Sequence, residues 1–189
     1  MRMIQTFFKT AIAIFLISSL VPLAAHAQEN QNGMSEKELK EYVQGQFEQM
    51  YKRAMDSASS RLEKGEPIKA FSVVTDRQGN VRLVRLQEAE KMKPDVALEI
   101  MRRSLRAMVE NGKIGATCLV YVAANPNKEA EAKQVLVAEM EHVFGPTLAE
   151  ITPFAKEDGK MVFGKAVTVK SKHSIFKLPE TDKTEEPAE

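Results

Sequence analysis

The stretch "GKIGATCLVYVAANPN", Gly112 to Asn127, contains the only cysteine of the 189-residue chain, Cys118. Between Ile114 and Ala124, both alternating sets of side chains are apolar or small. Successive side chains of a strand point to opposite faces of a sheet, so a strand that is apolar on both faces needs cover on both sides. The stretch therefore predicts a strand in the middle of a sheet, and the Asn-Pro-Asn triplet predicts its end.

Cys118 has two interpretations, a reactive or metal-binding group and a small residue of the core. Apolar neighbours on both faces of the strand would raise the pKa of its thiol and slow its reactions. A single cysteine also cannot form a disulfide within the chain, so the fold depends on packing alone. We therefore expect Cys118 to be a core residue.

A β-hairpin is predicted upstream of this strand. The segments "KAFSVVT" (69–75) and "VRLVRL" (81–86) are rich in branched residues, and they flank the turn-forming "DRQGN" (76–80). Because the side chains of each segment alternate, one face of the hairpin can be buried.

Two helices are predicted, one before and one after the hairpin. Ser35 and Glu38 have the spacing of a capping box, in which each side chain satisfies a backbone N–H of the other residue. A second helix begins near Pro94 and ends at Asn111-Gly112. The first helix runs to about Gly65, with apolar side chains every three or four residues: Leu39, Val43, Phe47, Met50, Tyr51, Ala54, Ala58 and Leu62.

The segment after the central strand is ambiguous. Residues 128–144, "KEAEAKQVLVAEMEHVF", contain apolar spacings that fit a helix and an alternation that fits a strand. Periodicity alone does not decide between the two. Further on, "TLAEITPF" (147–154) predicts an extended segment, and "KEDGK" (156–160) predicts a turn that leads into "MVFGKAVTV" (161–169).

The first 27 residues have the features of a secretory signal. Arg2 and Lys9 precede an apolar stretch of about 15 residues, where a membrane-spanning helix needs roughly 20, and Ala25-His26-Ala27 is a small-x-small cleavage site. An uncleaved membrane anchor is the alternative. We expect a soluble exported protein, periplasmic or secreted, with no stable membrane anchor after signal cleavage.

The chain is predicted to have four parts: a signal peptide (1–27), a flexible lead-in (28–34), a single α+β domain (35–178) and an acidic disordered tail (179–189). Cleavage of the signal leaves 25 basic and 26 acidic residues, a net charge of −1. A chain so close to neutral has no strong field to attract nucleic acid, so we expect no nucleic-acid partner.

The segments "NGKIGATCLVYVA", "VLVAEMEH", "ITPFAKEDGKMVFGKAV" and "HSIF" resemble an uncharacterised bacterial α+β family of unknown function. Met140-Glu141-His142 is similar to a Leu-Glu-His-like triplet of that family, with Met in place of Leu, and Phe163-Gly164 is similar to its Phe-Gly turn. The resemblance covers roughly residues 65 to 176. It implies a strand over 133–142, and it transfers no activity.

The predicted fold class is α+β, with a long N-terminal helix and an antiparallel sheet of about five strands on which two helices pack. The order is helix, two strands, helix, three strands. This order is similar to that of small profilin-like and roadblock-like domains, which are binding modules rather than enzymes. The similarity concerns the fold, and a fold does not determine function.

The chemistry-bearing residues form no recognisable motif. The mature chain has two histidines, His142 and His173, and neither lies in a zinc-binding pattern. On a strand, His142 would share a face with Met140, and Cys118 of a neighbouring strand would complete a soft-metal site. A hydrogen-bonded histidine at a sheet edge is the alternative, and His173 is expected to be exposed. We expect no catalytic, cofactor-binding or metal-binding residue.

The main functional hypothesis is a small exported, non-catalytic binding or interaction module. Its partner would be an unknown protein or a second copy, bound through the sheet edge or the first helix. An exported hydrolase or redox enzyme with a site scattered in sequence is the first alternative, and a soft-metal-binding protein is the second. The apolar stripe on residues 39–62 either packs on the sheet or contacts a partner.

Overall fold

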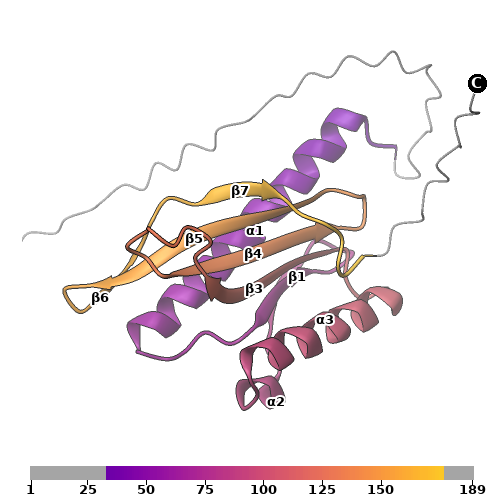
Figure 1. The fold of residues 1–189 in the computed structure, drawn as a ribbon. Coiled ribbons are helices and arrows are strands. Elements are labelled where there is room, and N and C mark those ends of the chain that lie inside the picture. Colours follow the sequence, from indigo (N-terminus) through magenta and orange to yellow (C-terminus); the bar gives the residue numbers. More distant parts are fainter. Residues whose placement is uncertain (1–32, 177–189) are drawn as a thin grey trace, which may run out of the picture. The chain divides into compact units, whose positions relative to one another are not determined.

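The quoted stretch forms the middle of the sheet, as predicted. The computed structural model describes residues 33–176, in which β3 (Ala116–Ala124) pairs with β1 (Phe71–Thr75) on one side and β4 (Gln134–His142) on the other (Figure 1). The first five residues of β3 are buried. The predicted signal (1–27), the lead-in as far as residue 32 and the acidic tail (179–189) lie outside the described residues.

The sheet has seven strands, all paired antiparallel, in the order β2-β1-β3-β4-β5-β6, and β7 pairs with β5 beyond the end of β6. The remaining strands are β2 (Val81–Val84), β5 (Thr147–Glu157), β6 (Lys160–Phe163) and β7 (Val167–Lys170). The predicted α+β class, with a long N-terminal helix and helices packed on an antiparallel sheet, is confirmed. The number of strands was underestimated, because a hairpin and a bulge after residue 147 produce three strands there.

One face of the sheet is covered by α1 (Glu36–Glu63), which runs behind the strands in Figure 1. The helix begins with the predicted capping box, in which Ser35 Oγ accepts from the Glu38 N–H and the Glu38 carboxylate accepts from the Ser35 N–H. No helix in residues 33–176 is both long and apolar enough to cross a membrane. The helical residues buried against the sheet are Val43, Gln46, Phe47, Met50, Ala54 and Ala58.

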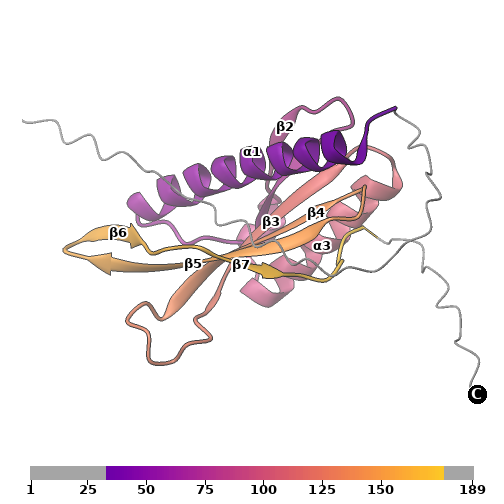
Figure 2. The ribbon, with the colours of Figure 1, turned by 90° about the horizontal axis from the view of Figure 1, so that it is seen from above.

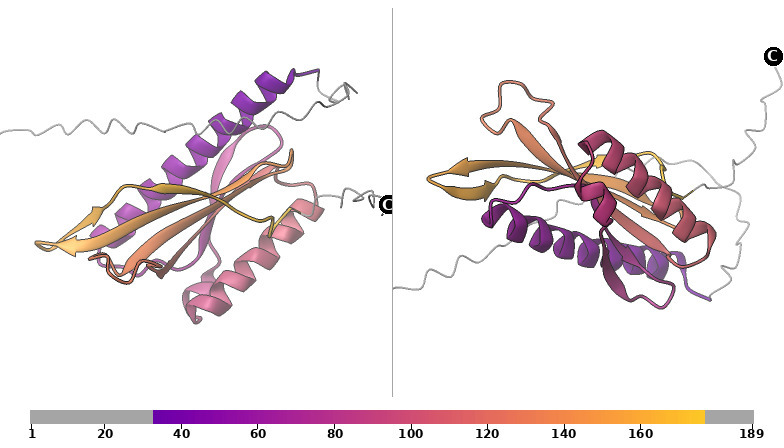
Figure 3. Two further views of the ribbon diagram at one scale, coloured as in Figure 1. Left: turned by 45° about the horizontal axis from the view of Figure 1, so that its top comes forward. Right: turned by 90° about the horizontal axis from the view of Figure 1, so that it is seen from below.

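The other face is covered only in part, by α3 (Pro94–Glu110), which follows the single-turn α2 (Gln87–Glu90). α3 begins at Pro94, as predicted, because first-turn N–H groups have no helical acceptor and a proline removes no hydrogen bond there. The helix packs on β1 and β3. In the view from below, the β5–β6 hairpin extends beyond α3 (Figure 3).

β1 is buried on both faces, whereas the sequence predicted one buried face for its hairpin. Val73 belongs to the cluster under α1, and Val74 belongs to the cluster formed with Met101 and Leu105 of α3. α1 covers one face of β1 and α3 covers the other, so neither face is left to solvent. In this hairpin, β2 alone keeps partly exposed side chains.

The ambiguous segment is a strand, β4, as the resemblance implied. Ala138 and Met140 face α1, whereas Glu139 and Glu141 face the side of α3. A carboxylate is tolerated on that face because other groups bind it, and Arg102 of α3 lies 3.0 Å from Glu139. Groups from other elements that bind Glu139 and Glu141 therefore favour the strand, whereas periodicity alone fitted both a strand and a helix.

A proline in β5 coincides with a bulge in the edge strand. Pro153 has no N–H, and its C=O accepts a hydrogen bond from the Gly164 N–H at 2.8 Å. The register of β7 with β5 is shifted by one residue from the register of β6, so the edge contains one extra residue between the two pairings. Pro153, which has no N–H to donate, therefore lies where the backbone hydrogen bonding between β5 and the edge strands is interrupted.

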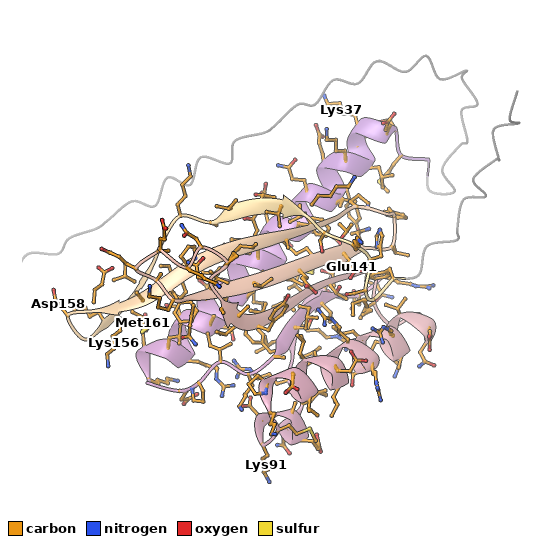
Figure 4. The ribbon with its side chains drawn as sticks, viewed as in Figure 1. Lys37, Lys91, Glu141, Lys156, Asp158 and Met161 are labelled. Atoms are coloured by element: carbon orange, nitrogen blue, oxygen red, sulfur yellow. The ribbon has the colours of Figure 1, made fainter. Side chains whose placement is uncertain are left out.

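The β5–β6 hairpin has the predicted turn. Asp158 and Gly159 have φ angles of +47° and +80°, the left-handed conformation that both central residues of a type I′ turn adopt. Figure 4 shows this hairpin, marked by Lys156, Asp158 and Met161, at the opposite end of the sheet from Glu141.

Met50→Ala should lower the free energy of unfolding by about 2–5 kcal/mol, because Met50 is fully buried between α1 and the sheet. Gln49→Ala, at the exposed position next to it, should change that free energy by less than about 0.5 kcal/mol. Urea unfolding of the two variants measures the difference. Small and equal effects would mean that the stripe of α1 does not pack on the sheet.

Candidate functional site

The three residues of the hypothetical soft-metal site lie on one face of the sheet, beneath α1. Cys118 of β3 is the register partner of Met140 on β4, and His142 is the partner of Ala116 two residues along β3. The alternation in the sequence therefore placed Cys118, Met140 and His142 correctly relative to one another. Their capacity to bind a metal depends on the other groups that contact them.

His142 has both ring nitrogens engaged by protein groups. Nδ1 accepts a hydrogen bond from the Phe144 N–H at 3.1 Å, which leaves Nε2–H to donate to Gln46 Oε1 at 3.1 Å. The rings of Tyr42, Phe47 and Phe144 lie 6.1, 6.2 and 4.9 Å from the imidazole ring, measured between centroids. Burial lowers the pKa of His142 to about 4, so the ring is neutral at physiological pH and has no lone pair free for a metal or a substrate proton.

Cys118 is fully buried, and burial raises the pKa of its thiol far above the usual range. A protonated thiol is a poor nucleophile and a poor metal ligand. Among residues 33–176, no three His, Cys, Asp or Glu side chains are grouped so that they could hold a metal ion. The contacts of Cys118 and His142 support the interpretation of both as core residues.

A polar group that the sequence did not predict joins α3 to the sheet. Arg102 donates to both carboxylate oxygens of Glu139, at 3.0 and 3.3 Å, and its guanidinium lies 5.8 Å from the centre of the Tyr121 ring. The Tyr121 hydroxyl donates to the same carboxylate at 2.7 Å, and burial together with that carboxylate raises the pKa of Tyr121. The tyrosine is therefore a protonated donor, and the group connects α3 with β3 and β4.

Glu141 is buried on the α3 side of β4, with 1% of its surface exposed. Its carboxylate accepts hydrogen bonds from three consecutive N–H groups, those of Ser174, Ile175 and Phe176, at 2.8–3.1 Å. The Ser174 hydroxyl also donates to it at 2.8 Å. Since the carboxylate holds another segment of the same chain, we call these contacts the Glu141 anchor; Figure 4 labels Glu141.

Two basic residues lie beside the Glu141 anchor. Arg106 Nε–H donates to the Ser174 C=O at 2.8 Å, and His173 Nδ1 lies 3.4 Å from Glu141 Oε2. The prediction that His173 is exposed is wrong, since only 24% of its side-chain surface is accessible. Sequence reasoning missed the anchor because 33 to 35 residues separate Glu141 from the groups that it binds, and no spacing signal spans that distance.

The face of β5, β6 and β7 that points away from α1 has no helix packed on it among the described residues (Figures 1 and 2). Along one row, exposure rises from 8% at Val137 through the half-buried Ile151 to 56% at Val167. We call this surface, with the adjoining part of β4, the uncovered face. Thr147, Glu157 and Lys160 lie at its two ends. Between them its side chains are apolar: Val135, Val137, Ala149, Ile151, Pro153, Ala155, Val162, Val167 and Val169.

The edge beside the uncovered face is cationic. Residues 160–176 contain four lysines and no Asp or Glu. All four lysines are exposed, and among the described residues none lies within 4.0 Å of a carboxylate oxygen. Glu150 of β5, which accepts a hydrogen bond from Thr168 Oγ1, places one carboxylate beside these lysines. The lysines outnumber it, so a local positive charge remains along residues 160–172, although the whole chain is nearly neutral. The lysines are Lys160, Lys165, Lys170 and Lys172.

Acidification from pH 6.5 to pH 4 should lower the free energy of unfolding more in the wild-type chain than in His142→Gln, by about 2–3 kcal/mol. The unfolded chain binds a proton on this histidine near pH 6.5, whereas the folded chain does so only near pH 4. The stability that the neutral, buried His142 contributes is therefore complete above pH 6.5, and it is lost as pH falls towards 4. Urea unfolding across this range measures it, and parallel curves for the two proteins would contradict the buried neutral state.

Comparison with protein-family models, with curated proteins and with solved structures found no match to this chain. The resemblance to an uncharacterised bacterial family stays an expectation, and it assigns no role to any residue. Function must therefore follow from the contacts, exposure and charges of the described residues.

Proposed function

We propose that this chain is an exported, non-catalytic binding module that contacts a protein partner through the uncovered face. The observation that carries the proposal is the set of exposed valines at the edge of that face: Val162 at 40%, Val167 at 56% and Val169 at 36%. They continue an apolar surface whose inner members are buried. Removing such a contiguous apolar surface from water favours association with a partner.

The state of the polar side chains supports binding rather than catalysis. A general base or a nucleophile needs a lone pair that reaches the substrate. The lone pairs of His142 and Glu141 are directed at groups of the chain itself, and the Cys118 thiol is enclosed in the core. These three residues therefore stabilise the fold, and the uncovered face is an exposed apolar surface that can contact another molecule.

Export is the second part of the proposal. It rests on residues 1–27, where a short basic leader, an apolar stretch and a small-x-small site occur in the order of a secretory signal. The single cysteine agrees with this destination, because a buried lone thiol is protected from oxidation and from pairing with other chains.

A photo-crosslinking amino acid at position 167 tests the binding function in the native organism. We expect an adduct of one discrete mass, because Val167 is the most exposed valine of the uncovered face. The same amino acid at position 96, where Val96 of α3 is 44% exposed, is the matched control and should give none. The further change Val169→Asp should remove the adduct at 167 by placing a charge in the apolar contact.

The absence of any discrete adduct at position 167, or equal adducts at 96 and 167, would contradict the proposed function. An adduct of twice the mass of the chain would identify a second copy as the partner. In that case size-exclusion chromatography with light scattering should give a dimer that Val169→Asp converts to a monomer.

A further inference from the structure

We infer that β7 is a docking edge for an acidic, extended segment of another protein, which joins the sheet as an additional strand. The inference rests on the proposed binding function and specifies the chemistry of the partner. Strand addition requires backbone groups that are free at a sheet edge, together with side chains that suit alternate residues of the guest strand. β7 supplies both.

The backbone of β7 has one side free. Successive residues of a strand direct their N–H and C=O groups alternately to the two sides. The C=O of Pro153 in β5 accepts from Gly164, so the backbone groups of Pro153 point to the edge strand. By alternation, those of Ile151 and Ala149 point the same way. Their partners on β7 are Val167 and Val169, whose backbone groups therefore point to β5. The groups of Thr168 and Lys170 therefore point away from β5, to a side on which no strand of the described residues pairs.

The side chains of β7 specify what the guest strand should contain. Val167 and Val169 lie on the uncovered face, so they would pack beside apolar residues of the guest. Thr168 and Lys170 lie on the opposite face, and Lys165 and Lys172 flank the strand. Cross-strand pairing with these lysines favours carboxylates. The best guest is thus an extended segment of about five residues in which Glu or Asp alternates with apolar residues.

A second copy of this chain fits the edge less well than an acidic partner. Antiparallel pairing of two β7 strands would bring Lys165, Lys170 and Lys172 of both copies together. Like charges on paired strands are destabilising, and lysines at an edge are a recognised means of preventing self-pairing. The same charges attract a guest of opposite sign and accelerate its association.

The chain's own C-terminal residues are the competing occupant. Residues 177–189, "KLPETDKTEEPAE", contain five acidic residues and two lysines, and they follow the anchored Phe176 directly. Two prolines and few apolar residues make them a poor match for the alternation that β7 favours. The experiment below separates this occupant from a partner.

Fluorescence anisotropy with a labelled peptide in which three glutamates alternate with two valines tests the inference on the full mature chain, residues 28–189. We expect saturable binding that weakens with added salt, and about tenfold weaker binding of the matched peptide with lysines in place of glutamates. Thr168→Pro should weaken binding of the acidic peptide by about tenfold, since it removes an outward N–H and no backbone hydrogen bond to β5. It also removes the hydrogen bond from Thr168 Oγ1 to Glu150 of β5, which the control Thr168→Val removes equally. Thr168→Val, which keeps that N–H, should change binding by less than about threefold.

Two further variants keep the test decisive. If Thr168→Pro fails to fold by circular dichroism, the exposed triple change Lys165→Glu, Lys170→Glu and Lys172→Glu takes its place. That variant should reverse the preference between the two peptides. A chain ending at Phe176 should bind the acidic peptide within about threefold of the full mature chain.

Equal affinity for both peptides, or unchanged affinity in Thr168→Pro, would overturn strand addition at β7. Binding only after removal of residues 177–189 would assign the edge to the chain's own tail instead of a partner. Each of these results leaves the crosslink at position 167 as an independent measure, so failure of the edge assignment and failure of the binding function are distinguishable.

Discussion

The position of β7, the free edge of the sheet, depends on the hydrogen bonds that the buried Glu141 carboxylate accepts. All four residues of β7 are exposed, so the strand gains little from burial of its own side chains. Its position is fixed at one end by the bulge that joins it to β6, and beyond its other end by the Glu141 anchor. Hydrogen bonds to a charged group contribute about 1.5–3 kcal/mol each, and this carboxylate receives several of them at once.

The Glu141 anchor also explains how the end of the described chain completes the hydrophobic cluster between α3 and the sheet. Ile175 and Phe176 are buried in the cluster formed by Met101 and Leu105 of α3, although they come from the end of the described chain. Three consecutive N–H groups bind Glu141, so the backbone donors of this segment need no partner strand. α3 and the anchored segment together cover the part of the second face over β1 and β3, and the uncovered face is the part over β5, β6 and β7.

Much of the fold could be predicted from local patterns. The apolar run around Cys118 specified a central strand, the capping box at Ser35 specified where α1 begins, and Asp158-Gly159 specified a turn. Predictions failed where distant segments decide the outcome. The second buried face of β1 depends on α3, and the bulge that divides β6 from β7 lies opposite Pro153 in the neighbouring strand.

In the candidate site, too, local patterns predicted part of the arrangement and contacts between distant segments determined the rest. Alternation along β4 correctly placed His142 and Met140 on one face, beside Cys118. It could not reveal that Gln46 of α1 and the Phe144 N–H engage both nitrogens of His142, because these contacts arise only from packing. The lysines of residues 160–176 were visible in the sequence as a run without acids. Their location on an open edge beside exposed valines required the sheet topology.

The proposed addition of a guest strand is compatible with how the two cores are built. Both α1 and α3 lie over β1 and β3, so the core is thickest under the central strands and β5–β7 extend past α3. An extended guest would lengthen the sheet without disturbing either helix. The backbone would supply affinity, and the lysines and valines would supply selectivity.

Hydrogen exchange of the Val167 and Val169 amides in Glu141→Gln is the most direct test of the central claim, that the Glu141 anchor holds β7 in place. A glutamine presents an N–H₂ group to the backbone donors of residues 174–176, so we predict about ten- to hundredfold faster exchange in β7, with β3 unchanged. Glu139→Gln, on the same face of β4, should leave β7 exchange unaltered. Unchanged protection of β7 in Glu141→Gln, with residues 174–176 released, would contradict the account.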